Sequence, residues 1–210
     1  MCGRFALHSQ PEVAAIAFGL SVVPAYAPRY NIAPVSKVLI VRDREAALVR
    51  WGLVPRWAKD PSIGARMNNA RAETVAEKPS FREAYRKRRC LIPADGFFEW
   101  KPEAGRKQPY YVCPSGSDLF AIAGLWESWQ GPDGALETCV IITTEANEKM
   151  SAVHERMPVI VAAEAYSSWL GGAEGMLQPC PAAAIEIRRV SRAVNSARND
   201  SPALIEPSED

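Results

Sequence analysis

The sequence predicts an α+β fold: a single domain built on a curved, barrel-like and mainly antiparallel β-sheet with a few short helices. Short runs rich in β-branched and aromatic residues recur along the chain, whereas stretches with helical apolar spacing are few. Proline and glycine, 17 and 13 of the 210 residues, interrupt these runs at close intervals, as expected for strands joined by tight turns. No repeat, linker or low-complexity tract is present, so we expect one domain over residues 1–210.

Three segments are predicted to be helices. Residues 11–20 begin with a proline, which suits the first helical turn, keep apolar spacing and end near Gly19. Residues 80–90 are predicted to form a helix with a strongly basic end. Residues 163–172 are predicted to form a helix that stops at a pair of glycines.

The remaining apolar runs are predicted to be strands. The turn-forming sequence QGPDG, residues 130–134, separates two of the longest runs and predicts a hairpin. The polar tail, from about residue 203 to residue 210, is expected to be mobile. The predicted strands cover residues 37–43, 46–55, 90–100, 108–113, 119–129, 136–146, 158–163 and 184–191.

Charge and hydropathy exclude several classes of protein. The formal net charge is +1, so the composition is not that of a protein that coats polyanions, although it is compatible with a local basic patch. No apolar run approaches the roughly 20 residues of a membrane span. Arg4, His8 and Gln10 interrupt any signal-peptide core. We therefore expect a cytoplasmic protein that does not bind a membrane.

The five cysteines indicate neither a metal site nor a disulfide framework, because they are odd in number, widely spaced and form no Cys/His cluster. Only Cys2 has a special position. If Met1 is removed, Cys2 becomes the N-terminus and carries an α-amine and a thiol two carbons apart. Both groups react near neutral pH, because their unperturbed pKa values are about 7.7–8.0 and about 8.5.

Three further positions carry side chains typical of catalysis. Glu99 lies between Phe98 and Trp100 in a predicted strand, where partial desolvation would raise its pKa and suit it to proton transfer; a solvated strand glutamate is the alternative. His154 is either an acid–base group near neutral pH or a structural histidine. Asn69, in the segment MNNARAET, is either a site residue or the cap of a turn.

Basic and aromatic residues alternate between residues 50 and 71. Arginine binds phosphates through two hydrogen bonds, and tryptophan stacks on nucleobases. The pattern favours a nucleic-acid surface; a core strand with solvated charges is the alternative. The residues concerned are Arg50, Trp51, Arg56, Trp57, Lys59, Arg66 and Arg71.

In their order along the chain, these segments resemble the SRAP family, whose members are abasic-site-processing proteins first described as SOS-response-associated peptidases. The resemblance runs over nearly the whole chain, and the ordered set with a cysteine at position 2 is specific. The matching pieces are MCGRF at the start, RYNIAP (29–34), WGLVPRWA (51–58), NARAET (69–74), PADGFFEW (93–100), HERMPVI (154–160) and VSRAVNSARND (190–200).

The resemblance implies that the chain binds abasic sites in single-stranded DNA, with single-strand/double-strand junctions also compatible, and shields the lesion in the DNA damage response. Family members form a covalent DNA–protein crosslink. On that basis the α-amine of Cys2 forms a Schiff base with the sugar aldehyde, and its thiol then closes a thiazolidine ring, provided Met1 is removed. Abasic-site lyase activity and autoproteolytic removal of Met1 are further implications.

The resemblance further implies that no metal and no organic cofactor is needed. We expect a monomer that associates with the nucleoid when DNA is bound.

The resemblance also assigns roles to residues of this chain. Beside Cys2, Asn69 would hold the N-terminal residue or the sugar, Glu99 would act as acid and base, and His154 would assist proton transfer. Thr143 would position His154, and Trp100 would pack the wall of the site. DNA contacts are assigned to Arg4, Asn31, Pro34, Trp51, Trp57, Arg71 and Arg156.

Other classes of function stay open. An N-terminal-nucleophile cysteine hydrolase, of the amidotransferase or peptidase type, would use the Cys2 thiol to attack an amide, with its own α-amine as base. A noncovalent single-strand DNA-binding module would bind the same strand without forming a product.

Overall fold

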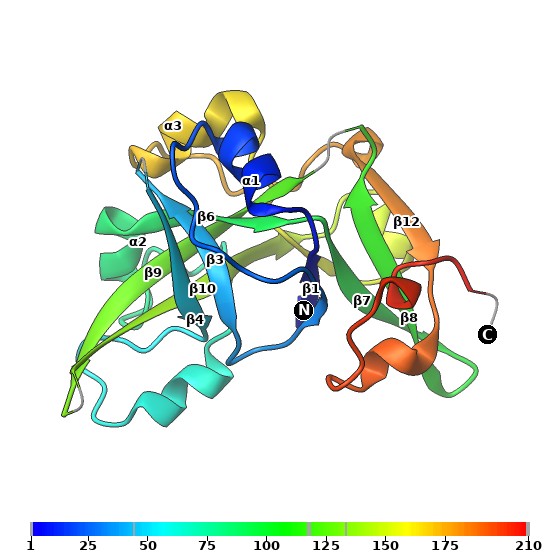
Figure 1. Cartoon of the computed structure of the whole chain (residues 1–210), viewed down its shortest axis with the longest axis horizontal. Helices are drawn as coiled ribbons and strands as arrows, with labels where there is room; N and C mark the ends of the chain where they lie inside the picture. The colour runs from blue at the N-terminus through cyan, green and yellow to red at the C-terminus, as the bar shows by residue number, and fades with distance from the viewer. Residues whose placement is uncertain (1, 44, 117–118, 133, 209–210) are drawn as a thin grey trace.

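A closed five-stranded β-barrel forms one part of the structure, which is a computed structural model describing residues 2–43, 45–116, 119–132 and 134–208. The strands are paired in the order β10–β4–β3–β6–β9, and β9 pairs again with β10, which closes the ring. This architecture confirms the predicted α+β, barrel-like fold (Figure 1). The barrel strands are β3 (Lys37–Arg42), β4 (Glu45–Trp51), β6 (Arg89–Ala94), β9 (Phe120–Gly131) and β10 (Gly134–Glu145).

An open antiparallel sheet lies beside the barrel (Figure 1). Its strand order is β12–β8–β7–β1–β2, so the first strand of the chain lies inside the sheet, between two partners. Because β1 begins only two residues after Cys2, this sheet fixes the position of the N-terminal residues. The strands are β1 (Arg4–Leu7), β2 (Arg29–Ile32), β7 (Gly96–Glu103), β8 (Arg106–Pro114) and β12 (Ile185–Arg189).

The barrel and the open sheet are joined by a corner at Asp95. The sequence predicts one strand over residues 90–100, but the structure has β6 in the barrel and β7 in the open sheet. The buried Asp95 carboxylate accepts hydrogen bonds from the backbone N–H groups of His8 (2.5 Å) and Ser9 (2.9 Å), and the Asp95 N–H donates to the Ala6 carbonyl (2.8 Å). These bonds satisfy the backbone at the point where the strand changes sheets.

The predicted β9–β10 hairpin is present and pairs Gly131 with Gly134. Asp133, within the predicted turn, lies outside the described residues. Two strand predictions were too long. The strand predicted over 46–55 ends at Trp51, because Gly52 turns the chain with a φ of 127°. In the segment 158–163, Pro158 ends β11 (Arg156–Pro158), and Ile160 makes only an isolated bridge to Ile122.

The three predicted helices exist, and all three are shorter than expected. Helix α1 (Pro11–Phe18) ends at Gly19 in the left-handed region, with a φ of 63°. Helix α2 (Arg82–Lys87) stops before Arg88, which is buried in an ion pair with Glu127. Helix α3 (Tyr166–Leu170) follows a 3-10 turn at Ala163–Ala165. The other 3-10 segments are Pro61–Arg66, Met150–Ala152, Ala182–Ala184, Arg192–Asn195 and Pro202–Leu204.

The C-terminal segment packs on the open sheet. Leu204 is buried, Val190 makes a bridge with Pro207, and the Ser208 N–H donates to the Arg189 carbonyl (3.1 Å). The mobility expected for residues 203–210 stays a prediction. Residues 209–210 lie outside the described part of the chain. None of the helices in the described residues is long and apolar enough to cross a bilayer.

Candidate functional site

Cys2 lies at the seam between the open sheet and the barrel. It precedes β1, whose Arg4 and Phe5 pair with Phe98 and Phe97 of β7. The Cys2 carbonyl accepts a hydrogen bond from the Asn69 side-chain amide (2.8 Å). Asn69 begins β5 (Asn69–Arg71), a short strand that pairs in parallel with β10 of the barrel sheet. One contact thus ties the N-terminal residues to the barrel.

Glu99 comes from β7 and is 2% exposed. Burial raises the pKa of its carboxyl group, and the nearby His154 opposes this rise in part. Burial raises the pKa of the Cys2 thiol as well, and the charge of Glu99 raises it further. The thiol is therefore held in its neutral form until a base removes its proton.

His154 faces Glu99, with 4.0 Å between its Nε2 and the Glu99 Oε2. Its Nδ1 accepts a hydrogen bond from the Arg156 N–H (3.0 Å), which assigns the proton of the neutral imidazole to Nε2. The Arg156 carbonyl also lies 3.2 Å from the same Nδ1. The backbone of residue 156 therefore fixes the orientation of the His154 ring.

A polar cleft of about 410 Å³ opens over these groups. Sequence reasoning missed two of its residues, Lys107 and Asn195. Asn195 lies in the matched segment VSRAVNSARND, which could have indicated it, whereas nothing in the sequence singles out Lys107. The cleft is lined by Arg4, Glu99, Trp100, Lys107, His154 and Asn195.

Arg4 and Asn31 hold the C-terminal segment against the site. The buried Asn31 amide donates to the carbonyls of Val194 (3.2 Å), Ser196 (3.0 Å) and Asn199 (2.8 Å). Arg4 donates to the Asn31 side-chain oxygen (2.8 Å) and to the Val194 carbonyl (2.9 Å). In this structure, Asn31 therefore contacts backbone rather than solvent.

The two predicted tryptophan contacts differ in exposure. Trp51 is fully buried, donates to the Asn68 carbonyl (2.8 Å) and packs edge-on against Phe5. Trp57 is 60% exposed. Its loop is anchored on both sides: Arg56 pairs with Glu127 (2.9 Å), and the Trp129 indole donates to the Ala58 carbonyl (2.7 Å).

The remaining predicted residues lie near the cleft or on its approaches. Trp100 lines the cleft and donates to the Asn195 side chain (2.7 Å). Thr143 is buried, and its hydroxyl donates to the Ala70 carbonyl (3.4 Å). Arg71 is exposed and Pro34 is half-buried. Arg156 forms an ion pair with Glu73, a contact that the sequence did not indicate.

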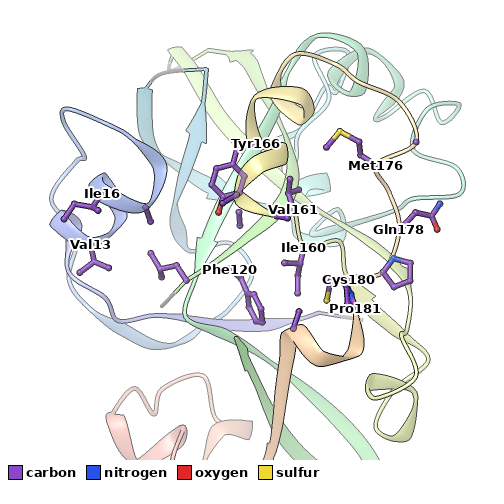
Figure 2. Close-up of a pocket in the computed structure, with 18 residues that line it drawn as sticks. Val13, Ile16, Phe120, Ile160, Val161, Tyr166, Met176, Gln178, Cys180 and Pro181 are labelled. Atoms are coloured by element: carbon purple, nitrogen blue, oxygen red, sulfur yellow. The ribbon is translucent and has the colours of Figure 1, made fainter. Parts of the chain in front are cut away.

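A larger pocket, of about 810 Å³, contains none of the predicted site residues. Its walls come from α1, the start of β9, the segment around α3 and the loop that leads to β12. Figure 2 shows mainly apolar side chains there, including Ile16, Phe120, Ile160 and Val161. The polar cleft, rather than this pocket, contains Glu99 and His154. No cluster of residues that could bind a metal occurs in the described residues.

The protein thus belongs to a class of single-domain β-barrel proteins whose candidate site lies near the N-terminus. In this chain the site has a buried cysteine at position 2, a glutamate and a histidine at the seam of a closed barrel and an open sheet. The family model described as "SOS response associated peptidase (SRAP)" matches residues 1–197. The chain belongs to the SRAP family.

Named relatives and a solved structure agree with this membership. The chain is 45% identical over 222 residues to the abasic site processing protein YoqW of Bacillus subtilis, which covers 98% of this chain and 99% of the relative. It is 36% identical over 226 residues to the abasic site processing protein HMCES of Gallus gallus, covering 88% and 67%. A crystal structure of a protein from Bacteroides thetaiotaomicron matches with a TM-score of 0.88 at 26% identity, covering 99% of this chain and 100% of that chain.

Proposed function

We propose that this protein processes abasic sites in single-stranded DNA and that, once Met1 is removed, Cys2 forms a thiazolidine crosslink with the lesion. The observation that carries the proposal is the placement of Asn69 against the Cys2 carbonyl and of His154 against Glu99, with the strand that follows Cys2 paired to the strand that carries Glu99. The names of the relatives support abasic-site processing as the general activity. The protein would thereby shield the lesion in the DNA damage response, as a monomer and without a metal or organic cofactor.

The crosslink is a condensation in which one water is released. The ring-opened abasic sugar offers an aldehyde at C1′, and the Cys2 α-amine adds to it and loses water to give a Schiff base. The Cys2 sulfur then bonds to C1′, and the thiol proton moves to a base while the nitrogen of the imine regains a proton. The product is a five-membered ring that only a cysteine with a free α-amine can form.

The geometry suggests a role for each neighbour. Glu99, whose pKa is raised by burial, can donate a proton to the sugar ring oxygen during opening and later accept the proton of the buried thiol. His154, 4.0 Å from Glu99, can return that proton to the sugar. Asn69 fixes the Cys2 carbonyl, and its Oδ1 is buried without a donor among the described residues, so it can accept from the α-amine.

The DNA would run across the cleft and its approaches. Arg71 and Trp57 are exposed and suit contacts with phosphate and base, and half-buried Pro34 suits the edge of the strand or a junction. Arg4 borders the cleft, where a phosphate can approach it. Asn31 and Trp51, assigned to DNA contact by the family resemblance, are buried and would support the surface from within.

Two finer activities follow from the same chemistry. A Schiff base acidifies the neighbouring C2′ proton, and its removal expels the 3′ phosphate, so slow abasic-site lyase activity is expected. Removal of Met1 by the chain itself would be a peptidase activity with one substrate bond. Lyase activity competes with the crosslink, and removal of Met1 precedes it. Both would use the same residues.

Intact-protein mass spectrometry tests the proposal. The protein is mixed with a single-stranded oligonucleotide bearing one abasic site, with and without borohydride. We expect a species that lacks Met1 and gains the DNA mass without borohydride. Cys2→Ala should give no borohydride-independent adduct, whereas the matched control Cys180→Ala, at another buried thiol, should give the normal adduct.

Two results would contradict the proposal. A borohydride-independent adduct formed by Cys2→Ala would exclude the thiazolidine. A chain that has lost Met1 but hydrolyses glutamine or a peptide, and forms no DNA adduct, would favour the N-terminal-nucleophile hydrolase. Binding of the oligonucleotide with no covalent product would favour the noncovalent module.

A further inference from the structure

Arg156 lies beside the cleft with its guanidinium already engaged. Its Nη1 and Nη2 contact the two carboxylate oxygens of Glu73 at 2.5 and 3.0 Å. This two-bond geometry is the one that an arginine also uses for a phosphate. The carboxylate therefore occupies the position that a DNA phosphate would take on this side chain.

The two partners of this ion pair are held to different degrees. The Arg156 side chain is 15% exposed, and its Nη2 also donates to the Thr143 carbonyl (2.7 Å). The Glu73 side chain is 52% exposed and follows the short strand β5. If the carboxylate moves into solvent, the guanidinium stays anchored to β10. The arginine is thus preorganised, and the glutamate is the part that can leave.

A second arginine contributes to the same place. The hydrogen bonds from Arg156 lower the pKa of the Glu73 carboxyl group, and the charges of Arg156 and then Arg71 lower it further. The Glu73 carboxylate thus stays ionised throughout the neutral range, paired with Arg156 and within the field of Arg71. Because a phosphodiester also carries one negative charge, it can replace the carboxylate one for one.

We propose that Glu73 is a built-in competitor for the phosphate that binds Arg156, and that it weakens noncovalent binding to undamaged strands so that retention depends on the covalent step. This inference rests on the proposed DNA-binding function. Glu73 touches neither the reacting sugar nor Cys2; it acts through Arg156. The near-neutral charge of the chain agrees with a protein whose nonspecific affinity is kept low.

The test measures binding of a fluorescent undamaged oligothymidine by anisotropy over a series of salt concentrations. Glu73→Gln should bind more tightly than wild type at low salt, by roughly five-fold for one partly screened charge. In the wild type, a phosphate that displaces the Glu73 carboxylate from Arg156 replaces one negative charge with another, so the local charge does not change. In Glu73→Gln there is no carboxylate to displace, so the phosphate neutralises the charge of Arg156. The slope of log affinity against log salt should therefore become steeper by about 0.7 in the variant.

Glu145→Gln is the matched control. Glu145 is exposed, lies opposite Arg156 in the β10–β11 register and makes no ion pair among the described residues, so it removes the same charge without freeing the guanidinium. The double variant Glu73→Gln/Arg156→Gln should lose the gain in affinity. In a mixture with excess undamaged strand, Glu73→Gln should also crosslink the abasic strand more slowly than wild type.

Several outcomes would overturn the inference. Equal affinities and salt slopes for Glu73→Gln and Glu145→Gln, with normal crosslinking by wild type, would remove the competitor role and leave the proposed function intact. A loss of affinity and of thermal stability in Glu73→Gln would make Glu73 a structural residue only. No DNA binding by any variant, wild type included, would overturn both proposals.

Discussion

At the scale of single residues, the burial of Glu99 favours the neutral form of its carboxyl group. An acid whose pKa is raised in the folded protein binds more protons there than in the unfolded chain. Its contribution to stability is therefore fully present below the unfolded pKa, about 4.3, and is lost as the pH rises through the folded pKa. At neutral pH the ionised Glu99 thus lowers the free energy of unfolding.

We expect Glu99→Gln to be more stable than wild type at pH 7 while forming the crosslink much more slowly. The gain should shrink as the pH is lowered toward 4, where Glu99 is protonated in both states. Urea unfolding across this pH range measures the effect, with Glu145→Gln as an exposed control. A variant less stable than wild type at pH 7 would show that the contacts of the carboxylate outweigh its desolvation.

The sequence carries more signal for the central residues than for their surroundings. Cys2, Asn69, Glu99 and His154 each stand in a short motif, and the structure places Asn69 against Cys2 and His154 against Glu99. The sequence could not show that Asn31 faces inward, because the four residues of β2 give too little alternation to fix the side that each residue faces. The Glu73–Arg156 pair joins residues 83 positions apart and has no local signal.

At the scale of elements, Gly52 and Gly64 allow the end of β4 to touch the segment that follows the Trp57 loop. A Cβ at Gly52 would lie 2.4 Å from the Gly64 carbonyl oxygen, and Gly52 also has a φ of 127°. Gly105 has a φ of 76° but open space around its Cβ position. Gly52 thus combines a left-handed φ with crowding, whereas Gly105 has the left-handed φ alone. Comparing the two positions separates backbone strain from crowding.

We expect Gly52→Ala to lower the free energy of unfolding by more than about 2 kcal/mol, because strain and a backbone clash add. Gly105→Ala should cost only about 1 kcal/mol of strain. Urea denaturation measures both, and single-strand affinity should fall only in Gly52→Ala, since Trp57 moves with its loop. Equal losses at the two sites would argue against the crowding.

Val35, beside Pro34, is a β-branched residue in the left-handed region with a φ of 74°, and it is 47% exposed. Such a conformation is costly for valine and acceptable for asparagine. Val35→Asn should therefore raise the free energy of unfolding by about 1 kcal/mol. Val22→Asn, at an exposed valine outside the left-handed region, is the control and should not stabilise. Chemical denaturation of both variants decides the point.

The prediction of elements failed where burial is continuous. Residues 90–100 are mainly apolar, and the prediction of one strand passed over the Asp95–Gly96 pair, a turn signal that marks the corner between the two sheets. Strands β1, β2 and β5 were missed because four residues or fewer give too little alternation to recognise. The longer β9 and β10 have full-length patterns and a turn sequence, and they were predicted to within a few residues.

At the scale of the whole molecule, the C-terminal segment is part of the site although it lies far away in sequence. Asn31 holds three of its carbonyls, and each bond contributes about 1 kcal/mol. Asn31→Ala should release residues 191–208 from the open sheet and expose Arg192 and Arg198 to trypsin. Ser196→Ala leaves the Ser196 backbone bond in place and is the control. Limited proteolysis followed by mass spectrometry measures the release; equal cleavage rates would assign the anchoring elsewhere.

The register of the β1–β7 pairing also fixes the distance of the N-terminal residues from the Asp95 corner. From the Asp95 corner, the register Ala6–Gly96, Phe5–Phe97 and Arg4–Phe98 sets how far along β7 the chain reaches before Cys2. Each residue of a strand advances the chain by about 3.3 Å and turns the next side chain to the opposite face. One residue inserted between Cys2 and Arg4 would therefore displace the thiol by about a strand step. The reach of the reactive group is thus counted in residues from the corner, so that length, as well as side-chain identity, constrains the first five residues.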